Sequence, residues 1–78
     1  MNTIFTQHSR KRMITYGISE ADVIEAIVSP DGVVTGYRNR QIYQKALNGH
    51  ILRVIVEEAE GIKTVVTVYR ARRTRYEM

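Results

Sequence analysis

Cysteine and tryptophan are absent from this sequence of 78 residues, and proline and phenylalanine each occur once. Without cysteine the chain can form no disulfide, no thiolate metal site and no cysteine nucleophile. This absence is typical of a cytoplasmic protein, whose core must hold without covalent links. The two histidines have no carboxylate pair at metal-ligand spacing beside them, so we expect neither a metal ion nor another cofactor.

Long apolar segments are also missing. No segment approaches the roughly 20 apolar residues that a membrane helix needs, so we expect no membrane association, and we expect no processed leader. A chain this short buries only roughly 60% of its unfolded surface, which predicts one modest core in a single domain over residues 1–78. A homodimer or a partner interface is a candidate for completing so small a core.

Basic residues exceed acidic ones by 12 to 8, and most of the arginines lie near the two ends of the sequence. The basic residues near the ends are Arg10, Lys11, Arg12, Arg70, Arg72, Arg73 and Arg75. The planar guanidinium group suits bidentate contacts with phosphate. The pattern indicates nucleic acid as a partner, although a solvated basic surface that keeps the protein in solution explains it equally well.

Helix signals dominate the first part of the chain. Thr6 can cap a helix over residues 7–16, along which Met13 and Tyr16 are expected in the core or at its rim. Gly17 ends this helix, because glycine adopts the left-handed conformation that commonly follows a helix.

A second helix is predicted to follow. Ser19 and Asp22 form a variant capping box, in which aspartate replaces the usual glutamate, and the apolar residues at 23, 24, 27 and 28 recur at helical spacing. The sequence Ser-Pro-Asp-Gly at residues 29–32 ends this helix, because proline cannot continue it and glycine accepts the positive φ of a turn.

From residue 33 onward the sequence alternates with the period of a β-strand. Three such runs cover residues 41–47, 51–58 and 62–70. Residues 33–37 could add a fourth strand, and the Asn48-Gly49 dipeptide is typical of a tight hairpin turn. We expect an α+β fold in which two N-terminal helices pack on one face of a three- or four-stranded antiparallel sheet, with residues 3–6 as an extended lead.

Period-two alternation assigns the strand side chains to two faces. The face expected to meet the helices carries Ile42, Leu52, Val54, Val56, Ile62, Val66 and Val68. The opposite face is expected to carry Tyr43, Lys45, Arg53, Lys63, Thr67 and Tyr69. Because aromatic rings stack on unpaired bases while cations hold the phosphates, this second face is a candidate RNA-binding surface. An ordinary solvated sheet face, in which tyrosine and threonine reflect strand propensity, is the alternative.

His8 and Arg12 are expected one turn apart on the first helix. An imidazole can accept the proton of an RNA 2′-hydroxyl that attacks its own phosphate, and a nearby guanidinium group can stabilise the charge that develops. The structural alternative is that His8 joins the start of the helix to the sheet. Residues 70–76 are either the frayed end of the last strand or a basic arm that reaches the substrate.

Several motifs together resemble a known family. They are His8-Ser9, Arg12-Met13, Gly17-Ile18-Ser19, Asp22-Val23, Arg53-Val54 and Val65-Val66-Thr67-Val68-Tyr69. Over nearly its whole length the chain resembles a bacterial family catalogued as domain of unknown function four-two-five-eight, which is similar to the RelE/ParE-like toxin superfamily. The resemblance implies two helices before an antiparallel sheet, and a ribonuclease that an antitoxin neutralises, although some superfamily members inhibit gyrase instead. Many family members carry alanine in place of Ser9 and arginine in place of Tyr16, so one cation of the family helix is missing here.

The resulting hypothesis is a toxin-like, metal-independent endoribonuclease of a toxin–antitoxin system, with RNA and an acidic antitoxin protein as partners. The catalytic residues would be His8, Arg12, Arg53, Thr67 and Tyr69, and the RNA-binding residues Tyr43, Lys45, Arg70 and Arg72. His8 or Tyr69 would move the proton, while the arginines would hold the scissile phosphate. The alternatives are a non-catalytic module of the same fold that binds nucleic acid or protein, and a purely structural or antitoxin-type protein.

Overall fold

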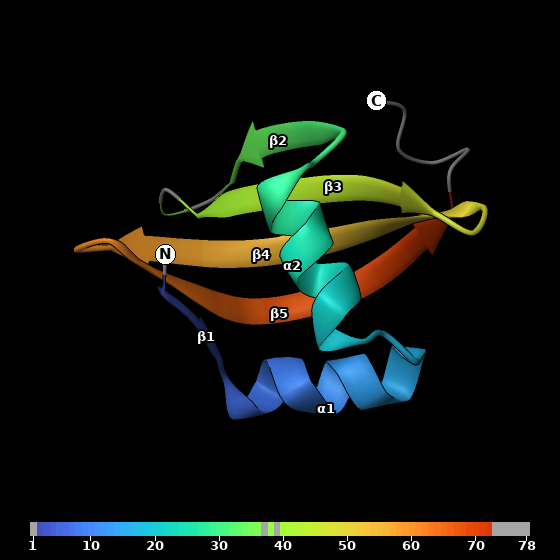
Figure 1. Ribbon diagram of the computed structural model, residues 1–78, viewed down its shortest axis with the longest axis horizontal. Helices are drawn as coiled ribbons and strands as arrows, with labels where there is room; N and C mark the ends of the chain where they lie inside the picture. Colours follow the sequence, from blue (N-terminus) through green and yellow to red (C-terminus); the bar gives the residue numbers. More distant parts are fainter. Residues whose placement is uncertain (1, 37, 39, 73–78) are drawn as a thin grey trace.

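The computed structural model describes residues 2–36, 38 and 40–72, which form an α+β fold (Figure 1). The elements in chain order are β1 (Asn2–Phe5), α1 (Gln7–Tyr16), α2 (Glu20–Val28), β2 (Gly32–Thr35), β3 (Gln41–Leu47), β4 (His50–Ala59) and β5 (Ile62–Arg72). All of these strands join one five-stranded sheet in the order β1-β5-β4-β3-β2. Neighbouring strands from β2 to β5 are antiparallel, whereas β1 runs parallel to β5. The predicted α+β fold with two helices is confirmed, but the sheet is mixed and has more strands than the three or four expected.

The strand that the sequence analysis missed is β1, which lies at the edge of the sheet. Its residues pair in parallel with the start of β5, from Asn2 opposite Ile62 to Phe5 opposite Val65. A strand of 4 residues has almost no alternation of its own, and its partner lies far along the chain. The local pattern could therefore indicate an extended lead but not this pairing.

The three predicted alternating runs form β3, β4 and β5. β3 has the predicted bounds, and the other two strands extend by one or two residues, so that β5 continues to Arg72. Asn48 and Gly49 form the predicted turn with φ angles of 50° and 81°. β2 corresponds to the optional fourth strand expected at residues 33–37, and it covers Gly32–Thr35. The segment expected as a frayed end or a basic arm is thus strand up to Arg72, and residues 73–76 lie outside the described residues.

Both predicted helix starts are confirmed by their capping contacts. Oγ1 of Thr6 accepts a hydrogen bond from the backbone N–H of Ser9 at 3.0 Å, and Oγ of Ser19 accepts one from the N–H of Asp22 at 3.1 Å. Gly17 ends α1 in the left-handed conformation with φ of 66°, where a side chain would be strained.

α2 lies across the face of the sheet that carries the core cluster, whereas α1 runs along the β5 edge and contributes Met13 to the same cluster (Figure 1). α2 crosses β3 and β4, whereas α1 runs beside β5 and packs through its buried residues Ser9 and Met13. No helix in the described part of the chain is long and apolar enough to cross a membrane.

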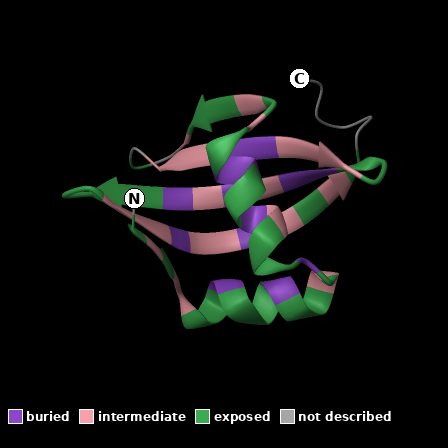
Figure 2. Cartoon of the chain, viewed as in Figure 1, coloured by how far each residue is buried: buried purple, intermediate pink, exposed green. Residues whose placement is uncertain are grey.

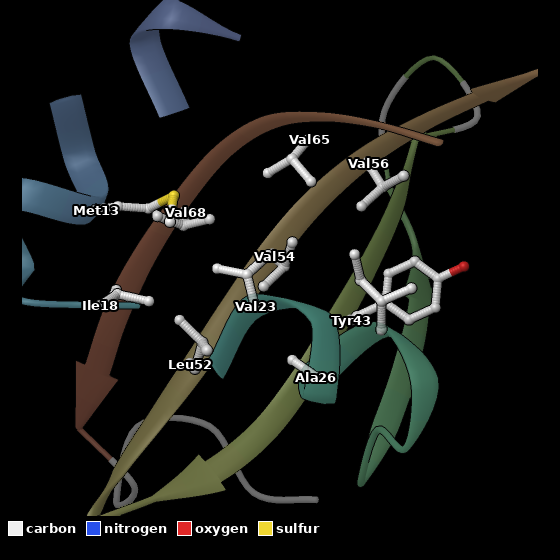
Figure 3. Packing of buried hydrophobic residues seen from close by; sticks show 11 residues of the cluster. Met13, Ile18, Val23, Ala26, Tyr43, Leu52, Val54, Val56, Val65 and Val68 are labelled. Carbon is white, nitrogen blue, oxygen red and sulfur yellow. The ribbon is translucent and has the colours of Figure 1, made fainter. Parts of the chain in front are cut away.

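Buried apolar side chains form a core cluster between the helices and the middle of the sheet (Figures 2 and 3). The cluster consists of Met13, Ile18, Val23, Ala26, Ile27, Tyr43, Leu52, Val54, Val56, Val65 and Val68. The predicted core positions of Leu52, Val54, Val56 and Val68 are confirmed, because all four side chains are buried here.

A β-bulge in β5 changes the face on which several residues lie. Ile55 pairs with Thr67, but the next residue, Val56, pairs with Val65, so Val66 is an extra residue in β5. Val65 is therefore fully buried under the helices, while Val66 is half-buried. The predicted core position of Val66 is wrong, because a strict period of two cannot accommodate an extra residue.

The bulge also reverses the predicted faces of two residues that precede it. Lys63 lies two residues before Val65 and hence on the helix side, whereas Ile62 lies on the opposite side. Ile42 is on that opposite side as well, since it pairs with Ile55, whose two neighbours in β4 belong to the core cluster. The predicted core positions of Ile62 and Ile42 are therefore wrong.

Candidate functional site

Three of the predicted catalytic residues lie together on the face of the sheet opposite the helices. Arg53 pairs with Tyr69, and Thr67 lies two residues before Tyr69 on the same strand. Both neighbours of Arg53 in β4, Leu52 and Val54, belong to the core cluster, so Arg53 and its partner point the other way. The predicted placement of these three residues on the open face is confirmed.

Arg53 and Tyr69 form a stacked and hydrogen-bonded pair. Nη1 of Arg53 donates to the hydroxyl oxygen of Tyr69, and Cζ of Arg53 lies 5.4 Å from the ring centroid. Both side chains are half-buried in the surface of the sheet. A guanidinium group held over a ring in this way is pre-organised, so it loses less conformational freedom when an anion binds.

His8 reaches the same face from the first turn of α1. Its Nε2 atom lies 3.1 Å from Oγ1 of Thr67, within hydrogen-bond distance. The start of the helix is fixed by Thr6, whose backbone N–H donates to the carbonyl of Val65 at 3.1 Å and whose Oγ1 donates to the carbonyl of Val66 at 3.0 Å. His8 itself is exposed. This contact fits both interpretations of His8, as a join between helix and sheet and as an imidazole placed beside a site.

Together these contacts place His8, Thr67, Tyr69 and Arg53 in one row from α1 across β5 to β4, which we call the open-face row. Alternate residues of a strand are about 7 Å apart, so the side chains of Thr67 and Tyr69 emerge side by side at that spacing. The row combines an imidazole, two hydroxyl groups and a fixed cation. Such a set can hold a phosphodiester and move a proton at it.

Arg12, the fifth predicted catalytic residue, belongs to a different cluster. Its Nη1 atom donates to the hydroxyl oxygen of Tyr16 at 3.3 Å, and its Cζ atom lies 5.9 Å from the centre of that ring. Cζ of Arg70 also lies 5.9 Å from the centre of the Tyr16 ring. The structure thus places both arginines at the Tyr16 ring. The sequence analysis missed this role of Tyr16, although its position four residues after Arg12 on one helix is a signal that could have shown it.

Two predicted RNA-binding residues, Tyr43 and Lys45, lie on the helix-covered face. Tyr43 pairs with Val54 and belongs to the core cluster, where its exposed fraction is 9% (Figure 3). Lys45 pairs with Leu52, and its Nζ atom donates to the carbonyl of Ser29 at 2.7 Å. The prediction that these side chains lie on the open face is wrong. The two-residue turn at Asn48 and Gly49 fixes which residues of β3 and β4 pair. It places Tyr43 and Lys45 opposite Val54 and Leu52, which were themselves expected in the core.

Lys63, predicted on the open face, is held among other side chains on the helix side. Its Nζ atom donates to Oε2 of Glu58 and to the hydroxyl oxygen of Tyr43, both at 2.8 Å. The hydrogen bond to Glu58 and, after it, the one to Tyr43 raise the pKa of Lys63 above its ordinary value. The charge of Lys63 is thus engaged within the protein.

Arg70 and Arg72, the other two predicted RNA-binding residues, lie at the end of β5. They pair with Leu52 and His50 on the helix side of the sheet, and both arginines are exposed. The basic residues Arg73 and Arg75, farther along the chain, lie outside the described residues. The candidate site therefore has two separate parts, which are the open-face row and the basic end of β5 beside α1.

Carboxylates near the β4–β5 turn pair with basic residues. Oε1 of Glu57 lies 3.7 Å from Nε of Arg40, and Oε2 of Glu58 lies 2.8 Å from Nζ of Lys63. Among the described residues, no three histidine, aspartate or glutamate side chains gather as candidate ligands of a metal ion. Two surface hollows, of about 390 and 450 Å³, lie at the α1–α2 corner and beside the β4–β5 turn, and neither is lined by the open-face row.

The fold and this surface define a small basic α+β protein that combines an exposed histidine with arginine–tyrosine pairs. The model of the family described as Domain of unknown function (DUF4258) matches residues 5–70, from the end of β1 to Arg70 in β5. The chain belongs to this family, as its sequence motifs predict. No curated protein and no solved structure matches the chain significantly.

Proposed function

We propose that this protein is a RelE/ParE-like, toxin-type endoribonuclease that cleaves RNA by attack of its 2′-hydroxyl, with protein side chains supplying the catalytic groups. The observation that carries the proposal is the open-face row, in which the imidazole of His8 lies 3.1 Å from Thr67 and Thr67 is followed by the Arg53–Tyr69 pair. A proton acceptor and a cation therefore flank two hydroxyl groups on one surface. General acid–base catalysis and stabilisation of the developing charge at phosphorus both need groups of these kinds.

In the proposed reaction His8 accepts the proton of the 2′-hydroxyl while the 2′-oxygen attacks the adjacent phosphorus. The bond between phosphorus and the 5′-oxygen then breaks, and that oxygen takes up a proton from the hydroxyl of Tyr69. The products are a 2′,3′-cyclic phosphate and a 5′-hydroxyl end. His8 returns its proton to Tyr69 through solvent, which restores both residues for another cycle.

Arg53 and Thr67 would hold the phosphate during this step. The negative charge on the non-bridging oxygens rises as the fifth bond to phosphorus forms, and a guanidinium group stabilises it most when it is already in position. Stacking on Tyr69 provides that positioning, with Cζ of Arg53 at 5.4 Å from the ring centre. The loss of one such donor lowers the rate by about 100- to 1000-fold in other enzymes.

An acidic antitoxin is the protein partner that this proposal implies. The chain has a formal net charge of +4, and the open-face row adds an exposed imidazole to a guanidinium group on one surface. An acidic segment that covers the row would block the substrate phosphate and match its charge. The second candidate function, a non-catalytic nucleic-acid-binding module, is supported by the separate Arg12 and Arg70 cluster, which needs no proton transfer to hold an anion.

Cleavage of a mixed-sequence RNA in the presence of a chelator tests the proposal. The wild type should produce 2′,3′-cyclic phosphate ends, and His8→Ala and Arg53→Gln should each lower the rate by about 100-fold or more. His50→Ala is the matched control, because His50 is exposed at the start of β4 and its replacement should leave the rate unchanged. Circular dichroism confirms that the variants are folded. If the wild type leaves RNA intact but retains it at low salt, the binding module is correct and the nuclease is not.

A further inference from the structure

The ring of Tyr16 is shared by two arginine side chains from different elements. Arg12 lies one turn before it on α1, and Arg70 reaches it from β5, with each Cζ atom 5.9 Å from the ring centre. The hydroxyl oxygen of Tyr16 also accepts a hydrogen bond from Nη1 of Arg12 at 3.3 Å. Both arginines are exposed, whereas Tyr16 is half-buried and packs against the core cluster. The half-buried ring thus supports two exposed cations.

Four other cations of the described chain have carboxylate partners. The ion pairs are Arg10 with Glu20 at 3.1 Å, Arg40 with Glu57 at 3.7 Å, Lys45 with Glu25 at 3.9 Å, and Lys63 with Glu58 at 2.8 Å. Within the described residues, no ion pair is formed by Arg12 or by Arg70. Two like charges gathered at one ring repel each other, and an anion bound between them relieves that repulsion.

The position of this cluster relative to the open-face row follows from α1. The helix runs beside β5, with His8 at its first turn and Tyr16 at its end. Because each helical residue advances about 1.5 Å, these two residues are about 12 Å apart along the axis. A short single-stranded segment can span this distance along α1, so that one phosphate lies at the row while another reaches the cluster.

We propose that Arg12 and Arg70 form a phosphate-binding subsite for the RNA strand next to the position of cleavage, with Tyr16 as the residue that positions both guanidinium groups. The inference rests on the proposed function, since it assigns the path of the same substrate. Two planar guanidinium groups suit one phosphate, because each can donate two N–H groups to its non-bridging oxygens. Arg12 therefore binds the substrate away from the reacting phosphorus, which differs from the role that its spacing from His8 predicts.

Binding of a fluorescent 2′-O-methyl oligonucleotide, which lacks the attacking hydroxyl and cannot be cleaved by this route, tests the subsite. Fluorescence anisotropy gives the affinity over a range of salt concentrations for the wild type, Arg12→Gln, Arg70→Gln and the double variant. One lost phosphate contact lowers the slope of log affinity against log salt by about 0.7, which is about fivefold in affinity at 0.1 M salt relative to 1 M salt. Each single variant should therefore lose about 0.7, and the double variant should lose no more, because both guanidinium groups are needed to hold the one phosphate.

Arg10→Gln is the matched control, because Arg10 is on the same helix but pairs with Glu20. It should retain the slope of the wild type. Tyr16→Phe keeps the ring and should keep the affinity, whereas Tyr16→Leu should lower it as the arginine variants do. Unchanged slopes in both arginine variants would overturn the proposal. A loss of about 1.4 in the double variant would also overturn it, since the arginines would then hold separate phosphates.

The design separates this subsite from the nuclease. Binding that depends on Arg12 and Arg70, together with a wild type that cleaves no RNA, refutes the nuclease and supports the subsite. Cleavage by the wild type, together with salt slopes that neither arginine affects, refutes the subsite and supports the nuclease. If the wild type binds a labelled polyglutamate but not the oligonucleotide, and the double variant loses this binding, the cluster recognises acidic protein and the phosphate subsite is wrong.

Discussion

Thr6 ties α1 to the sheet, and its replacement by alanine tests that role directly. Oγ1 of Thr6 accepts the N–H of Ser9 at 3.0 Å and donates to the carbonyl of Val66 at 3.0 Å. Alanine removes both contacts but keeps the backbone hydrogen bond from residue 6 to the carbonyl of Val65. The variant therefore removes the hydroxyl group, together with the γ-methyl group beside it, and leaves the main chain in place.

The expected loss of stability follows from these two contacts. Loss of a threonine helix cap costs about 1 kcal/mol. Loss of a neutral hydrogen bond to a half-buried carbonyl costs about 1 kcal/mol more. A total of about 2 kcal/mol should lower the melting temperature of a domain of this size by roughly 8 to 16 °C.

Urea unfolding of Thr6→Ala and of Thr15→Ala, followed by circular dichroism, gives the two free energies of unfolding. Thr15 is a matched control, because it lies on the same helix and its exposed hydroxyl donates only backward to the carbonyl of Lys11 at 3.0 Å. A contact of this kind does not stabilise a helix, so the control should change little. Equal losses in the two variants would refute the role assigned to Thr6.

Three further predictions concern the rest of the fold. Gly17→Ala should lower the free energy of unfolding by about 1 kcal/mol in a urea titration, because φ at this position is 66° and a Cβ atom is strained there. Val65→Ala should cost about 2 kcal/mol and Val66→Ala less than 1 kcal/mol in the same assay, because Val65 is buried and Val66 is the half-buried bulge residue. Equal costs would contradict the position of the bulge. Hydrogen bonds to Glu58 and to Tyr43 raise the pKa of Lys63 above its ordinary value of 10.5. The folded protein therefore binds the proton of the Lys63 ammonium group more tightly than the unfolded chain does. The resulting stability is complete below pH 10.5 and is lost as the pH rises through the raised pKa, so Lys63→Met should weaken the dependence of melting temperature on alkaline pH.

The parts of the fold that sequence predicted correctly depend on local chemistry. The bounds of α1 follow from the Thr6 cap and from Gly17, and the β3–β4 hairpin follows from Asn48 and Gly49. The parts that it missed depend on distant residues. Neither the pairing of β1 with β5 nor the bulge at Val66 leaves a local pattern, because each is decided by packing between strands.

The candidate site was predictable to a similar extent. The shared face of Arg53, Thr67 and Tyr69 follows from strand alternation and from the antiparallel register of β4 and β5. The approach of His8 to Thr67 depends on β1, whose pairing sets where α1 begins, so no local signal fixes that distance. The contact between Tyr16 and Arg70 likewise joins elements that only the folded chain brings together.

The dependence of β1 and α1 on β5 has a consequence for the order of assembly during translation. The ribosome makes residues 2–16 before residues 62–72, so these first segments lack the strand on which they pack while the middle of the chain emerges. Contacts between distant parts of a chain form slowly, because a long loop must close first. A nascent chain that stops before β5 therefore lacks Thr67 and Tyr69 as well as the strand that holds His8 in place. The complete surface therefore requires β5 to be in place between β1 and β4.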